Sequence, residues 1–239
     1  MSEEKKKRSL WGLIAAGIVT AAVVIAAIGF IALLSTNGQS ERPAVQEEPA
    51  SEEAGSAAVE TGGACDLPSG NMTTVPDDIA WETVGGISWP TSKTLGPAGE
   101  KDGFPVCFSH SPVGAALAAI TTQFETLRHP PTDVGEFYLV DSPGKPSALE
   151  SVQGRTSESQ LSDLRRYGLT AAGFRVDEYT EDRALVYLVS AVPGSPTGFR
   201  GRPVPMVWVD GDWRAKVLDT GMTGQPIDVL DGQFTKWTD

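Results

Sequence analysis

Four residues of this chain are the best suited to nucleophilic or metal chemistry: Cys65, Cys107, His110 and His129. The stretch "PVCFSHSPVGAALAAI" places Cys107 and His110 three residues apart, a spacing that a thiolate–imidazole pair or half of a zinc site could use. A structural zinc site needs four ligands, often as two close pairs, and the spacings of these four residues fit no common pattern. Nothing in the sequence supplies a third group that would orient the histidine. The sequence therefore predicts neither a metal site nor a catalytic cysteine.

Charged residues form two further clusters. Asp177, Glu178, Glu181 and Asp182 lie around a predicted turn, where solvated carboxylates are ordinary and need no catalytic or metal-binding role. The stretch "FRGR" at 199–202 places two arginines on an acidic domain, and it predicts a loop rather than a nucleic-acid contact. No set of acid and base residues emerges, so the sequence predicts no catalytic residue, no cofactor and a protein that is not an enzyme.

The residues that follow Cys107 are typical of the beginning of a helix. Ser111 is a good N-cap because its hydroxyl can accept a hydrogen bond from a free N–H of the first turn, and Pro112 suits the first helical position. Apolar residues then recur at spacings of three and four from Val113 to Leu127, which predicts a helix with a buried face.

Residues 10–34 predict a membrane anchor. They contain no charge and one hydroxyl over 25 residues, whereas a bilayer core needs about 20 apolar residues in a helix. The run is also too long for the apolar region of a signal peptide. Four basic residues lie within residues 1–9 and only Arg42 follows within 30 residues, so we expect a single span in the plasma membrane, with the N-terminus cytoplasmic and the remainder extracytoplasmic.

The part of the chain beyond the span divides into a linker and a domain. Residues 35–64 contain six glutamates and no aromatic residue, which predicts a disordered acidic linker. Residues 65–239 contain 14 basic and 23 acidic side chains, a formal net charge of −9. A domain of this sign has no general attraction for nucleic acid.

The two cysteines lie in the part of the chain that we expect outside the cell. Two cysteines in an oxidising compartment are expected to pair, and a Cys65–Cys107 disulfide would fasten the start of the domain to the beginning of the first helix. The alternative is two free buried thiols.

The remaining patterns predict an α+β domain. Residues 65–108 predict an extended lead-in whose tryptophans cover the outside of the core, residues 132–156 fit either helix or strand, and residues 157–168 predict an amphipathic helix. Alternating apolar residues then predict antiparallel strands, including a hairpin at Asp210-Gly211-Asp212. Helices followed by such a meander predict helices packed on one face of a curved antiparallel sheet.

This order of elements resembles the cone-shaped NTF2-like fold. More narrowly, the chain is similar to the single-span, outward-facing NTF2-like proteins of conjugative and type IV secretion systems, the TcpC-like group, and most of all to an uncharacterised membrane-anchored branch found with Gram-positive mobile elements. The resemblance is carried by "VCFSHSPVGAALAA", "GFRVDEYTEDRALVYL" and "VPMVWVDGDWRAKVL", all within residues 105–218, about half of the chain. It implies a scaffold or assembly subunit of a transfer apparatus and identifies no chemical signature.

We therefore expect a non-enzymatic, membrane-anchored subunit of a cell-envelope assembly such as a conjugation or secretion apparatus. It would have protein partners and no nucleic-acid partner, and a homo-oligomer is compatible with this interpretation. The alternative is an extracytoplasmic small-ligand-binding or sensing module, which a cavity lined by two or more buried polar groups would favour. Near the C-terminus, Phe234 and Trp237 are expected either to dock on the sheet or to contact a partner.

Overall fold

The computed structural model describes residues 60–61 and 65–238. The membrane span predicted at 10–34 and the linker predicted at 35–64, except for residues 60–61, lie outside this part of the chain. Within the described residues, no helix is both long and apolar enough to cross a membrane.

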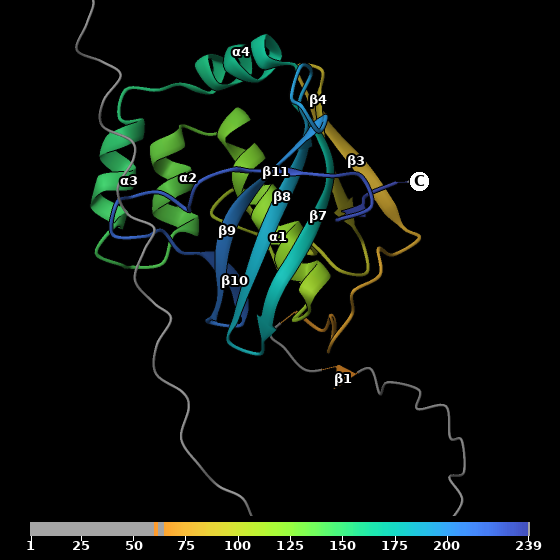
Figure 1. The fold of residues 1–239 in the computed structure, drawn as a ribbon. Coiled ribbons are helices and arrows are strands. Elements are labelled where there is room, and N and C mark those ends of the chain that lie inside the picture. Colours follow the sequence, from red (N-terminus) through yellow and green to blue (C-terminus); the bar gives the residue numbers. More distant parts are fainter. Residues whose placement is uncertain (1–59, 62–64, 239) are drawn as a thin grey trace, which may run out of the picture. The chain divides into compact units, whose positions relative to one another are not determined.

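The described residues form a mixed helix and sheet structure, which confirms the α+β class (Figure 1). Its helices are α1 (Pro112–Phe124), the short 3-10 helix η1 (Glu125–Leu127), α2 (Pro131–Tyr138), α3 (Lys145–Val152) and α4 (Ser157–Tyr167). Its strands are β1 (Glu60–Thr61), β2 (Pro68–Ser69), β3 (Ile79–Val84), β4 (Ile87–Ser92), β5 (Gly99–Lys101), β6 (Phe104–Val106), β7 (Thr170–Thr180), β8 (Arg183–Ala191), β9 (Phe199–Val209), β10 (Asp212–Ala215), β11 (Ile227–Val229) and β12 (Thr235–Lys236).

The largest sheet has the strand order β10-β9-β8-β7-β12, and β11 also pairs with β9. All of its pairs are antiparallel. The predicted hairpin at Asp210-Gly211 is confirmed. Both residues have positive φ angles, of 54° and 78°, the backbone conformation that a tight hairpin turn favours and that Asp and Gly tolerate.

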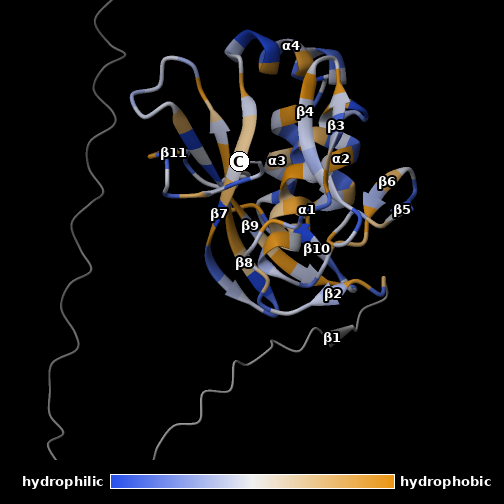
Figure 2. Ribbon diagram, turned by 90° about the vertical axis from the view of Figure 1, so that its right-hand side faces the viewer, coloured by the Kyte–Doolittle hydropathy of each residue, from blue (hydrophilic) through white to orange (hydrophobic). Residues whose placement is uncertain are grey.

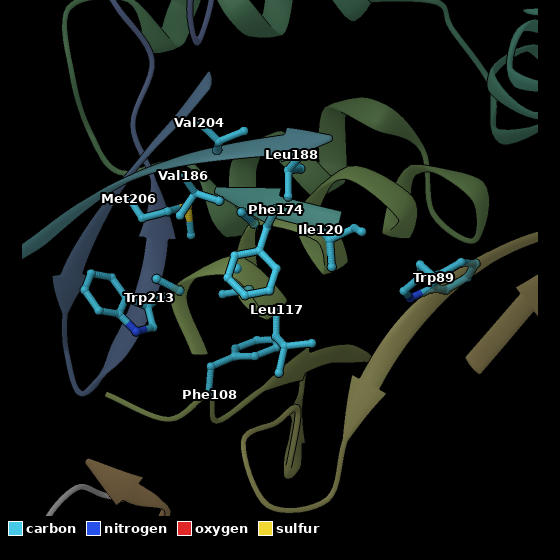
Figure 3. Close-up of a cluster of buried hydrophobic side chains, with 14 of the residues drawn as sticks. Trp89, Phe108, Leu117, Ile120, Phe174, Val186, Leu188, Val204, Met206 and Trp213 are labelled. Atoms are coloured by element: carbon cyan, nitrogen blue, oxygen red, sulfur yellow. The ribbon is translucent and has the colours of Figure 1, made fainter. Parts of the chain in front are cut away.

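Helix α1 lies against one face of this sheet, here called the inner face. Ser111 accepts a hydrogen bond from the Gly114 N–H, which confirms the predicted N-cap. Figure 2 colours α1 mostly orange, because its sequence is apolar on nearly every side. The helix is also buried on nearly every side. Figure 3 shows the core that results, in which side chains of α1 meet those of the strands, including Leu117, Ile120, Phe174, Val186, Leu188, Val204 and Met206.

Gly114 marks the closest backbone approach at the start of α1. A Cβ atom there would lie 1.9 Å from the backbone oxygen of Ser109, whereas a Cβ on Gly135 of α2 would meet only the flexible side chains of Leu149 and Leu139. We therefore expect Gly114→Ala to lower the free energy of unfolding by about 1–3 kcal/mol. Gly135→Ala should be neutral or gain up to about 1 kcal/mol of helix propensity. Urea unfolding of both variants checks this, and an equal effect at the two glycines would contradict it.

The segment 132–156, which fits either helix or strand by sequence, forms helices α2 and α3. The amphipathic helix predicted at 157–168 is confirmed as α4. Thr156 and Ser159 form a capping box at its beginning, and Gly168 ends it in the left-handed conformation, with φ 60° and ψ 31°.

The lead-in at 65–108 contains two hairpins, β3–β4 and β5–β6. Trp89 on β4 is fully buried and stacks on Phe124 of α1 with ring centroids 5.3 Å apart. Trp81 on β3 is 40% exposed. The prediction that the tryptophans cover the outside of the core is therefore wrong for Trp89, which is part of the core.

Residues 224–237, here called the C-terminal strap, run from one edge of the large sheet to the other, with β11 on β9 and β12 on β7. Figure 1 shows the strap in front of the sheet and α1 behind it. Trp237 is 2% exposed and its ring lies 4.5 Å from that of Phe174. Phe234 packs against Phe199, with ring centroids 5.0 Å apart. Of the two predictions for Phe234 and Trp237, docking on the sheet is confirmed.

Candidate functional site

Cys65 and Cys107 form a disulfide, with Cα atoms 5.5 Å apart, as predicted. Beside it, the Asp212 carboxylate accepts hydrogen bonds from the backbone N–H groups of Cys107 and Phe108, at 2.9 and 3.0 Å. Because the thiol of Cys107 is consumed by the disulfide, this cysteine has a structural role and offers no nucleophile.

The two histidines belong to separate surroundings. The ring of His110 stacks on Trp208 with centroids 3.9 Å apart, and its Nε2 lies 2.5 Å from the carbonyl oxygen of Glu181. The ring of His129 lies 4.4 Å from that of Phe104, and its Nε2 is 3.5 Å from Glu125. Among the described residues, no group of three or more His, Cys, Asp or Glu side chains could hold a metal ion.

The acidic residues at the β7–β8 turn do not converge on a site. Asp177 is bound by Arg175, at 2.6 and 3.0 Å. Glu178, Glu181 and Asp182 are exposed.

Glu125, at the end of α1, is the most deeply buried carboxylate of the described chain and was not singled out by the sequence patterns. Burial raises the pKa of its carboxyl, and Arg128, at 3.0 Å, opposes that effect. Arg128 also binds Glu82 at 2.5 Å and covers the ring of Trp89 at 4.7 Å. The carboxylate is 1% exposed, so this group ties α1 to the β3–β4 hairpin rather than presenting an acid or base to solvent.

A cavity of about 280 Å³ lies where the inner face of β8 and β9 extends beyond α1. A helix of 13 residues is about 20 Å long, whereas a strand of 11 residues such as β9 is about 36 Å long. One helix of this length cannot cover the whole inner face, and the uncovered end of the strands becomes one wall of the cavity. The residues after α4 and the beginning of the C-terminal strap complete it. The apolar part of its lining consists of the ring of Tyr167 and of Leu169, Leu188, Val192, Pro193 and Pro226.

The register of β9 places two arginines on the inner face. Side chains alternate along a strand, and Val204 and Met206 point into the core. Arg202 and Arg200 therefore continue the same face toward the cavity that both residues line. They lie opposite Leu188 and Ser190 of β8. The prediction of a loop at 199–202 is wrong, because these residues begin a central strand.

Arg202 is the charged residue of the cavity that has no partner among the described residues. Its guanidinium has no ion pair and no hydrogen bond with any other residue in the described part of the chain, although it remains open to solvent. Partial desolvation by the surrounding protein lowers the pKa of this guanidinium. Arg200, in contrast, is paired with Asp228 of the strap at 3.3 Å.

Two neutral polar side chains of the lining are partly buried. Ser190 on β8 and Gln123 on α1 are half-buried, and neither side chain makes a hydrogen bond to another described residue. Together with Arg202 and the exposed hydroxyl of Tyr167, they give the cavity four polar groups with unused hydrogen-bonding capacity. The residues that line it include no Asp, Glu, His, Cys or Lys.

A second cavity, of about 330 Å³, lies between β7, the start of α1 and the strap. The charged group there, Arg175, is neutralised by Asp177. Its side chain also covers the ring of Tyr187 at 4.7 Å. Since this charge is already matched within the protein, the cavity that contains Arg202 is the better candidate site.

The sequence contains one signal that could have located these arginines. Positions 200, 202, 204 and 206 share the period-two face of a strand that includes Val204 and Met206. The alternation alone indicates that Arg200 and Arg202 continue an inward face. It does not indicate that the helix ends before it reaches them.

No curated protein and no solved structure is significantly similar to this chain. A family model described as a domain of unknown function, DUF8175, matches residues 24–236, which include the whole cavity. The chain therefore belongs to the DUF8175 family.

Proposed function

We propose that residues 65–238 form a non-catalytic binding module that takes a small molecule in the cavity beside Arg202. The observation that carries this proposal is an apolar cavity containing an arginine whose guanidinium has no partner within the described chain. Its volume is just below the range of about 300–1,000 Å³ that is usual for ligand pockets. No carboxylate, imidazole, thiol or lysine of the described residues lines the cavity, and among its lining residues only the exposed Tyr167 carries a group that general acid–base catalysis commonly uses.

The arrangement also supports, as part of this proposal, the NTF2-like assignment made from the sequence. Helix α1 packs on the inner face of an antiparallel sheet, and the cavity occupies the end of that face that the helix leaves uncovered. In the same proposal, residues 10–34 anchor the chain in the plasma membrane, so that the cavity faces outward. A role within a conjugation or secretion assembly stays a prediction from the sequence. A sensing module would be compatible with the binding function proposed here.

A blocking substitution tests whether the cavity binds ligand. Ser190→Phe would fill the cavity from the floor formed by β8. Ser151→Phe, on the exposed side of α3, adds the same side chain elsewhere. We expect at least one member of a small-molecule library to raise the Tm of the full-length wild type and of Ser151→Phe, but not of Ser190→Phe. A ligand that stabilises all three proteins equally would place binding outside the cavity.

A further inference from the structure

We infer that the cavity selects a small monocarboxylate with an apolar body, held through the guanidinium of Arg202. This inference rests on the binding function proposed above. Inside the cavity, apolar side chains such as Leu169, Leu188 and Val192 surround the guanidinium of Arg202, which has no partner among the described residues. A planar guanidinium presents a fork of N–H donors that matches the two oxygens of a carboxylate.

The charge within the cavity matches one negative charge. Arg200 and Asp228 neutralise each other at 3.3 Å, so Arg202 contributes the single uncompensated positive charge. Arg202 lies opposite Leu188 and Arg200 lies opposite Ser190. A carboxylate at Arg202 would therefore have an apolar neighbour on the facing strand and a hydroxyl one pair further along it.

The neighbouring helix ends argue against a more highly charged ligand. Gln123 precedes the last residue of α1, and Tyr167 is the last residue of α4, so the cavity adjoins the C-terminal ends of two helices. The C-terminal end of a helix carries partial negative charge. This charge helps to support an unpaired arginine, but it disfavours the two charges of a phosphate monoester, a group that proteins usually bind at helix N-termini.

The guanidinium of Arg202, unpaired among the described residues, is consistent with a side chain whose partner is a bound ligand. Arg202 is exposed, so a ligand can reach its guanidinium, and partial desolvation lowers the pKa of that group. An arginine that served only to hold the fold together would be expected to have an ion pair or hydrogen bonds, as Arg128 and Arg175 do.

Calorimetric titration of the full chain in nanodiscs of neutral phosphatidylcholine tests the inference. The probes are benzoate, the isosteric neutral benzamide, and phenyl phosphate. We expect benzoate to bind at least about tenfold more tightly than benzamide, and more tightly than phenyl phosphate. Arg202→Gln should remove the preference for benzoate. Arg183→Gln, which removes an exposed arginine from the opposite end of β8, should keep that preference.

The Tm without ligand distinguishes a binding arginine from a structural one, because loss of a structural arginine would lower the Tm. Arg202 is exposed and has no partner among the described residues, so Arg202→Gln should not lower the Tm. A clear fall in Tm would overturn the inference, as would tighter binding of phenyl phosphate than of benzoate. Equal binding of benzoate and benzamide would overturn the selection for carboxylates and leave the proposed binding function standing. If no probe binds and no library member distinguishes Ser190→Phe from Ser151→Phe, both the inference and the proposed function fail.

Discussion

Replacing Asp212 by alanine is expected to lower the free energy of unfolding by about 3–5 kcal/mol. The carboxylate belongs to a residue that is 5% exposed, and it accepts the backbone N–H groups of Cys107, Phe108 and Trp213 at 2.9, 3.0 and 2.9 Å. Alanine would leave these donors without an acceptor, and each buried donor left unpaired costs about 1–3 kcal/mol. The loss would loosen the attachment of β10 to the loop that leads into α1.

Two further variants separate the loss of hydrogen bonds from the loss of charge. Asp212→Asn keeps one oxygen acceptor and should destabilise less than Asp212→Ala. Asp182→Ala removes an exposed carboxylate from the β7–β8 turn and should change stability by no more than about 0.5 kcal/mol. Equilibrium urea unfolding of the three variants gives the comparison. Equal stability of Asp212→Ala and Asp182→Ala would show that the carboxylate does not anchor this loop.

Removing the disulfide is expected to cost roughly 3–4 kcal/mol in the chain-entropy model. The bond joins residues separated by 42 positions, so a long loop gains freedom in the unfolded chain when Cys65 and Cys107 are both replaced by serine. The variant pair should unfold at a lower urea concentration than the oxidised wild type, and a reductant should lower the midpoint of the wild type only. A reductant effect of the same size on both proteins would have to come from something other than this bond.

The two substitutions should not be additive. Asp212 and the disulfide both hold Cys107. Loss of either anchor therefore loosens a segment that the remaining anchor also stabilises. Combining Asp212→Ala with the two serine substitutions should therefore cost less than the sum of their separate effects. Additivity within about 0.5 kcal/mol would indicate that the two anchors act on independent parts of the fold.

Several elements could be predicted from the sequence because short-range chemistry determines them. Ser111 and Pro112 lie next to the N–H groups that they serve, and Asp210-Gly211 supplies the backbone conformation of its own turn. Cys65 and Cys107 are the only cysteines of the chain, so their pairing needed no choice among partners. The segment 132–156 was ambiguous because its apolar runs are too short to show a period clearly, and packing of α2 against α3 and η1 resolved it as helix.

Trp89 and Glu125 show what the local patterns miss. Trp89 lies in a strand whose own pattern does not show which side will be covered, and it is buried because α1 packs on it. Glu125 follows the apolar face of α1 directly. Its burial becomes tolerable because Arg128, three residues later, is itself held by Glu82 from a distant hairpin.

The helix-start signals, the alternation of the strands, the hairpin turn and the cysteine pair could all be predicted from the sequence, because each depends on neighbouring residues or on residues that occur only twice. That Arg202 lines a cavity could be seen only in the folded protein. The direction of its side chain follows from the inward face of β9, but its surroundings depend on the register with β8, on the point where α1 ends and on the place where the C-terminal strap closes the edge. Whether a charged side chain has a partner depends on all the segments that pack around it, and here those segments are far apart in the sequence.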